Sequence, residues 1–201
     1  MSFRSSRLFD RGDTGVPPQP WAKAAGWGCL AAVAPSLLWR VAMLAGVDTG
    51  FAESELFHSS GFGTAYVLGL DVAELLGGVL CVGLVRPWGE VWPRWIPRLG
   101  GHTVHRLLPT TLGALGDIAL YAILTPLIVS FAGRWLGLTD AWVPTTGMSP
   151  AQTTVLLLAY IPLFCWPALL TVALLGYWRR RSPEGADRTV TPTPSASASA
   201  R

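Results

Sequence analysis

Four long apolar runs, each close to 20 residues and almost free of charge, limit what this chain can fold into. A helix needs about 20 apolar residues to cross a hydrocarbon core about 30 Å thick. Only 13% of the 201 residues are charged and 51% are hydrophobic, whereas an average soluble domain carries about 25% charged residues. The sequence therefore predicts an all-α fold, an integral membrane bundle of four transmembrane helices. The predicted spans are 27–46, 65–85, 108–131 and 153–178.

The segments outside the spans are polar. Residues 1–26 are basic and punctuated by prolines, which favours a flexible cytoplasmic arm. Residues 179–201 open with three arginines and continue in a Thr/Pro/Ser/Ala stretch that cannot bury a core, which predicts a disordered tail. The first apolar run is too long for a signal peptide and ends without a small-residue cleavage pattern, so we expect no cleavable signal.

The distribution of lysine and arginine predicts the orientation of the bundle. The first arm holds four of these residues, the loop between spans two and three holds four, and the tail holds five. The two loops on the other side hold none and one, so the bias is thirteen against one. Loops rich in Lys and Arg stay in the cytoplasm. Both termini are therefore predicted to be cytoplasmic.

The fourth span contains two prolines, Pro162 and Pro167. Proline removes a backbone donor and crowds the preceding turn of a helix. Transmembrane helices tolerate such breaks when neighbouring groups satisfy the freed carbonyls. We therefore expect a kink in this span.

Four ionisable residues lie inside the predicted spans: Arg40, Asp71, Glu74 and Asp117. At 1.5 Å per residue, Arg40 and Asp71 both lie roughly 9 Å below the outer ends of their spans, and Glu74 lies about 13 Å below. Ionisable groups at such depths normally face the bundle interior and find partners. The equal depths predict that Arg40 pairs with Asp71 or Glu74. Asp117 shares a helix stripe with Tyr121, which completes the candidate intramembrane polar cluster.

This polar cluster has two interpretations. In the first, the ion pair and a hydrogen-bonded or protonated Asp117 fix helix packing. In the second, three acids for one arginine leave surplus carboxylates, as a cation site, a proton relay or an acid-catalysed reaction would need. The sequence leaves both open.

The cysteines and histidines give no sign of a metal site or a cofactor. Cys29, Cys81 and Cys165 fall in different spans without C-x-x-C spacing, so we expect isolated packing residues rather than redox groups. His102 and His105 lack a nearby acid or cysteine and make a poor metal site. No phosphate-binding or dinucleotide-binding pattern is present. The arginines flank apolar spans, so their partner is expected to be the lipid bilayer and not nucleic acid.

The loop after the second span alternates tryptophans, arginines and prolines. Such a segment suits a rigid, non-helical connector in the inner headgroup layer, where arginine meets lipid phosphate and indole lies at the hydrocarbon edge. Glu90 is expected to pair with Arg94 or to cap a short turn. The predicted headgroup contacts are Arg86, Trp88, Trp92, Arg94, Trp95 and Arg98.

Within this loop, residues 89–101 carry the pattern G-E-x-W-P-R-W-x-P-x-L-x-G. The pattern resembles that of small actinobacterial integral membrane proteins of four spans. The resemblance covers about 20 residues closely and the four-span layout loosely. It implies a multi-pass protein of a bacterial plasma membrane, and it transfers no catalytic residue.

Three functions remain open at this point. The first is binding or transport of a small ligand at the intramembrane polar cluster, since such a cluster is by default a candidate site. The second is a membrane-embedded enzyme that acts on a lipophilic, isoprenoid-like substrate by acid catalysis. The third is a structural or accessory subunit that works as a homo-oligomer or with a partner subunit.

Overall fold

The computed structural model describes residues 17–92, 100–140 and 142–181. Over these ranges the fold is all-helical, and four helices are long and apolar enough to cross a membrane. The predicted fold class is therefore confirmed. The four helices are α1 (Pro20–Leu44), α3 (Gly61–Gly83), α4 (Leu107–Trp135) and the pair α5 (Pro150–Phe164) and α6 (Trp166–Arg181).

The helix ends differ from the predicted spans for local reasons. Helix α1 begins at Pro20, so residues 20–26 are helical, and their assignment to a flexible arm is wrong. Proline suits the first turn of a helix because the N–H that it lacks would have no partner there. Helix α3 begins at Gly61, where the Ser60 hydroxyl accepts a hydrogen bond from the Gly63 N–H at 3.0 Å. The preceding loop also contains a short helix, α2 (Ser54–His58).

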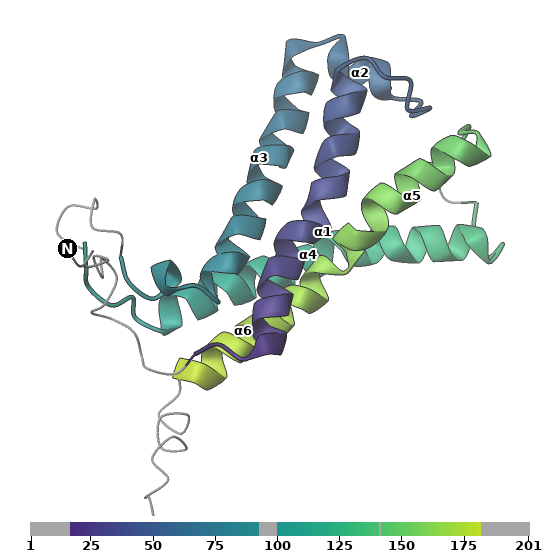
Figure 1. Cartoon of the computed structure of the whole chain (residues 1–201). Coiled ribbons are helices and arrows are strands. Elements are labelled where there is room, and N and C mark those ends of the chain that lie inside the picture. The colour runs from purple at the N-terminus through teal and green to yellow at the C-terminus, as the bar shows by residue number, and fades with distance from the viewer. Residues whose placement is uncertain (1–16, 93–99, 141, 182–201) are drawn as a thin grey trace, which may run out of the picture.

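The fourth span is interrupted between the two prolines at which a kink was expected. Helix α5 ends at Phe164 and α6 begins at Trp166, so the helix breaks at Cys165 between the two prolines. Neither Pro162 nor Pro167 has an N–H to donate to the preceding turn. The two halves remain roughly in line and cross α1 diagonally (Figure 1).

Helix α1 is the centre of the packing. It contacts α3, α5 and α6, and it lies antiparallel beside α3 (Figure 1). Glycines permit the close approach of α1 and α3: a Cβ on Gly26 would lie 3.2 Å from the Cys81 carbonyl oxygen, and one on Gly78 would lie 3.2 Å from the Leu30 Cα. Small residues at helix contacts are typical of membrane bundles.

Helix α4 is the least buried of the four and packs chiefly against α6. It runs across the direction of α1 and α3 rather than along it (Figure 1). Its contact with α6 includes Gly113, where a Cβ would lie 2.5 Å from the Leu174 side chain. The side of α3 that faces α4 is therefore left without close helix packing.

The tryptophan-rich loop is folded against the helix ends. It starts with the 3-10 turn η1 (Pro87–Gly89), and Val91 forms an antiparallel bridge with Thr103. The Trp92 N–H donates to the His102 carbonyl at 3.0 Å. The prediction of a non-helical connector is therefore wrong for Pro87–Gly89, which form a 3-10 turn.

The lipid contacts predicted for this loop are only partly described. Arg86 and Trp88 are exposed and Trp92 is half-buried. Arg94, Trp95 and Arg98 lie outside the described residues.

We expect Gly89→Ala to disrupt the junction between α3 and this loop. A Cβ on Gly89 would overlap the backbone carbonyl of Gly83, which cannot move without unwinding the end of α3. The expected loss is about 3 kcal/mol of stability, seen as a lower melting temperature and a lower membrane yield. Gly116→Ala is the matched control, because a Cβ there meets nothing within 4 Å. Equal melting temperatures for the two variants would contradict this close contact.

Candidate functional site

An ion triad lies between α1 and α3. Arg40 Nε donates to Asp71 Oδ1 at 2.5 Å, and Arg40 Nη2 donates to Glu74 Oε2, also at 2.5 Å. The side chains of Arg40 and Asp71 are both buried, at 9% and 8% exposure. The ion pair expected from equal depth is therefore present, and it engages both acids.

The spacing of residues on each helix explains the triad. Asp71 and Glu74 are three residues apart and share one face of α3. On α1, Ser36 lies one turn before Arg40, and its hydroxyl donates to the Val33 carbonyl at 2.8 Å and to Glu74 Oε2 at 3.4 Å. Helix α1 thus presents a cation and a hydroxyl to the two carboxylates of α3.

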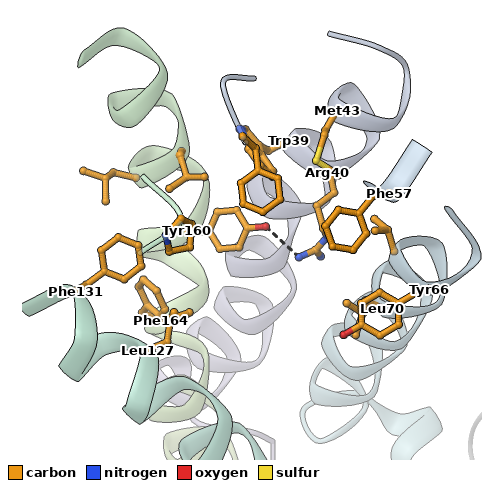
Figure 2. A pocket seen from close by; sticks show the side chains of 15 residues that line it. Trp39, Arg40, Met43, Phe57, Tyr66, Leu70, Leu127, Phe131, Tyr160 and Phe164 are labelled. Carbon is orange, nitrogen blue, oxygen red and sulfur yellow. Dashed lines mark hydrogen bonds between the residues drawn. The ribbon is translucent and has the colours of Figure 1, made fainter. Parts of the chain in front are cut away.

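Tyr160 of α5 is the fourth member of this site. Its hydroxyl oxygen accepts a 3.5 Å hydrogen bond from Arg40 Nη1 (Figure 2). Its ring packs edge-on against Trp39, with ring centroids 5.6 Å apart. Aromatic and aliphatic side chains from α1, α3, α4 and α5 lie around these groups and line a cavity of about 200 Å³ (Figure 2). We call it the aromatic cavity.

The triad does not use all of its oxygen atoms. Asp71 Oδ2 is buried and has no hydrogen-bond partner among the described residues. Glu74 binds through Oε2, and no hydrogen bond to its Oε1 occurs among the described residues. With both carboxylates ionised, the triad carries a net charge of −1. It therefore has acceptor capacity left over after Arg40 is bound.

A second and larger space of about 800 Å³, here called the large cavity, lies between α3 and α4. Its wall is almost wholly apolar, and Glu74 is the one charged residue that lines it within the described ranges. It extends along α3 from Leu70 to Leu84, about 20 Å of helix at 1.5 Å per residue. Three tryptophans also line it: Trp88, Trp92 and Trp166.

The two cavities adjoin at the triad. Leu70 lines both of them, Arg40 lines the aromatic cavity and Glu74 lines the large one. The Arg40–Glu74 ion pair thus lies between two apolar spaces.

The other two members of the predicted polar cluster are not part of this site. Asp117 Oδ2 accepts a 2.6 Å hydrogen bond from the Thr171 hydroxyl of α6, and Asp117 Oδ1 is buried without a partner among the described residues. Tyr121 is 46% exposed and lines neither cavity. Their inclusion in one cluster with Arg40 is therefore wrong, because the contacts of α4 are with α6 rather than with α1.

The structure also shows contacts that the sequence analysis missed. Glu90 pairs with Arg180 at the end of α6, and both are buried. Cys29 and Cys81 come from different helices but are packed in the same core cluster of buried apolar residues. The position of Tyr160 beside Arg40 could have been predicted, because Tyr160 lies in the fourth span at a depth similar to that of Arg40.

Among the described residues, no group of three or more His, Cys, Asp or Glu side chains is placed to hold a metal ion. No protein-family model matches the chain, and comparison with curated proteins and with solved structures finds no match either.

Proposed function

We propose that this protein binds a lipophilic small molecule in the large cavity, with the Glu74 carboxylate at the polar end of the site. The observation that carries the proposal is the unused oxygen of a half-buried carboxylate in the wall of an otherwise apolar space. Ligand sites are typically apolar pockets of about 300–1,000 Å³ with a few placed polar groups. The large cavity, at about 800 Å³, has this character.

The polar groups of the cavity define the chemistry of its ligand. Glu74 Oε1 can accept a hydrogen bond. Trp166 is 5% exposed, and its indole N–H makes no hydrogen bond to any of the described residues. Indole N–H groups usually find a partner when buried. The ligand therefore has a long apolar body and a polar head that donates to Glu74 or accepts from Trp166.

Filling the large cavity should displace its ligand. Gly116 lines the cavity and has open space at its Cβ, so Gly116→Phe adds bulk without a backbone clash. Gly69→Phe is the matched control, since Gly69 also faces open space but lines neither cavity. We expect organic extracts of the purified wild type and of Gly69→Phe to contain a bound lipophilic molecule that is absent from Gly116→Phe. Identical extracts from all three proteins would contradict the proposal.

A structural role for the triad is the second candidate. Arg40 has both acids and Tyr160 as partners, so it is fully engaged without a ligand. In that case, the triad and Tyr160 only hold α1, α3 and α5 together. An acid-catalysed reaction is less well supported, because Glu74 is the one carboxylate on the large cavity within the described ranges and it is bound to Arg40.

We propose a bacterial plasma membrane as the location, with both termini in the cytoplasm. The thirteen-to-one bias of Lys and Arg and the resemblance of the tryptophan-rich loop support this. Arginine–ring contacts occur at the proposed inner end: Arg86 lies 5.3 Å from the Trp27 ring, and Arg106 lies 5.2 Å from the Trp178 ring. Such pairs are typical of a membrane interface.

Reporter fusions test this orientation. A cytoplasmic reporter fused after Arg181 should be active, and a periplasmic-type reporter at the same place should be silent. Fusions at residues 55 and 140 should give the reverse. An externally active fusion after Arg181 would overturn the orientation.

A further inference from the structure

The aromatic cavity is bordered by a continuous series of five rings. The Tyr160 ring packs edge-on against Trp39, with centroids 5.6 Å apart, and Trp39 packs edge-on against Phe51 at 6.1 Å. Phe51 stacks on Phe57 at 6.2 Å, and Phe57 stacks on Tyr66 at 6.5 Å. These rings come from α5, α1, the loop after α1, α2 and α3. All five line the same cavity, so distant parts of the chain converge on one aromatic space.

Two polar groups of this cavity, the Arg40 guanidinium and the Tyr160 hydroxyl, lie together among the lining side chains (Figure 2). A guanidinium has five N–H donors, and Arg40 uses three of them, for Asp71, Glu74 and Tyr160. The Tyr160 hydroxyl accepts from Arg40 and donates to none of the described residues. A donor that is removed from water without an acceptor costs free energy. The cavity therefore provides hydrogen-bond donors and lacks an acceptor for them.

The charges around the cavity determine which ligands it can take. Aromatic rings often bind an organic ammonium ion through cation–π attraction. Here, however, Arg40 is the one charged residue that lines the cavity within the described ranges, and neither Asp71 nor Glu74 lines it. A cation in the cavity would meet Arg40 first and be repelled by it. An anion would meet a guanidinium whose charge is already matched by two carboxylates, each at 2.5 Å. The cavity therefore favours a neutral ligand.

The volume of the cavity limits the size of this ligand. An apolar cavity of about 150 Å³ in another protein holds benzene. The aromatic cavity, at about 200 Å³, can thus hold one ring with a small substituent. A lipid acyl chain could enter part of this space, but it would leave the donors of Arg40 and Tyr160 without an acceptor.

We propose that the aromatic cavity is a second binding site, which takes a neutral single-ring aromatic molecule that carries a hydrogen-bond acceptor such as a carbonyl oxygen. The acceptor oxygen binds the Tyr160 hydroxyl and the free N–H groups of Arg40. The ligand ring packs among the aromatic side chains, and edge-on or offset contacts between rings add to the gain from burial. The inference does not depend on the proposed function, because a different set of residues lines the large cavity.

The test uses the full chain in lipid nanodiscs, with para-fluoroacetophenone as the probe and fluorine NMR as the readout. Nanodiscs without protein give the background from the lipid, and we expect saturable binding above it. Tyr160→Phe removes the donor and keeps the ring, so it should weaken binding of the probe about tenfold. It should leave binding of para-fluorotoluene unchanged, since this molecule has the ring but no acceptor. Tyr121→Phe is the matched control and should change neither, because Tyr121 lines neither cavity.

Variants that fill each cavity locate the probe. Leu157 lines the aromatic cavity, whereas the next residue, Leu158, is 67% exposed and lines neither cavity. Leu157→Trp should abolish saturable binding, and Leu158→Trp and Gly116→Phe should leave it intact. Binding that is lost in Gly116→Phe and kept in Leu157→Trp would place the probe in the large cavity. That result would overturn this inference and leave the proposed function standing.

Three other results would also overturn the inference. The first is the absence of saturable binding to the wild type. The second is equal affinity of the probe for the wild type and for Tyr160→Phe, which would show that the hydroxyl donates nothing to the ligand. The third is displacement of the probe by tetramethylammonium, which would show that the cavity takes a cation. Melting temperatures confirm that each variant is folded, and the comparison of Tyr160→Phe with Tyr121→Phe decides the matter if Leu157→Trp is not.

Discussion

Arg40→Leu is expected to reduce the stability of the bundle by about 3–5 kcal/mol. The change strands two buried or half-buried carboxylates, Asp71 and Glu74, inside the membrane. Part of this loss is relieved when a stranded carboxylate takes up a proton, so we expect a reduced yield rather than none. Asp71→Lys should not accumulate at all, because it places a second cation against Arg40. Thermal denaturation in detergent and membrane yield measure both effects.

A double variant and a surface control make this prediction specific. Arg40→Leu combined with Glu74→Leu should be more stable than Arg40→Leu alone, since only one carboxylate is left without a cation. Arg134→Leu removes an exposed pair with Asp140, in which the charged atoms are 3.7 Å apart, and should change stability by less than about 1 kcal/mol. A single Arg40 variant as stable as Arg134→Leu would show that the triad contributes nothing to the bundle.

Glu90→Leu should be the most damaging change at the other end of the bundle. It leaves Arg180 buried, with the Leu84 carbonyl, at 3.1 Å, as the remaining hydrogen-bond acceptor of its guanidinium among the described residues. Arginine cannot lose its proton in a protein, whereas a stranded carboxylate can gain one. We therefore expect Glu90→Leu to cost about 3–5 kcal/mol and Arg180→Leu to cost less.

The comparison of these two variants uses melting temperatures measured side by side. Arg86→Leu is the control, because Arg86 is exposed and contacts only the Trp27 ring among the described residues. It should lose at most about 1 kcal/mol. A larger loss for Arg180→Leu than for Glu90→Leu would mean that burial of the arginine charge does not govern this contact.

The number and order of the membrane-spanning helices could be predicted from the sequence because the charges are segregated between long apolar runs. The residues at which the helices begin and end were predicted less accurately. Helix α1 starts at Pro20, a proline at the first turn, whereas the charge-free apolar run begins only after Lys23. The break in the helix at Cys165 was predictable, since proline acts locally on the backbone.

Contacts between helices could be predicted only where the depth of two residues in the membrane determines that they pair. Arg40, Asp71 and Glu74 share a depth, and an arginine in a membrane needs a partner, so their pairing followed from counting residues. The same estimate of depth would have placed Tyr160 at the level of these three residues. The packing of Cys29 and Cys81 in one core cluster depends on how each helix is rotated, and apolar faces in lipid carry little signal for rotation. The separation of Asp117 depends on the packing of α4 against α6, which hydropathy does not encode.

Site-resolved photolabelling in lipid vesicles tests the ligand site most directly. The probe is a long-chain alcohol that carries a diazirine near its hydroxyl, and labelled residues are mapped by mass spectrometry. The account predicts labels concentrated around Glu74 and Trp166, lost in Gly116→Phe and retained in Gly69→Phe. Labels spread evenly over the lipid-facing residues of all four spans, and unchanged in Gly116→Phe, would contradict it.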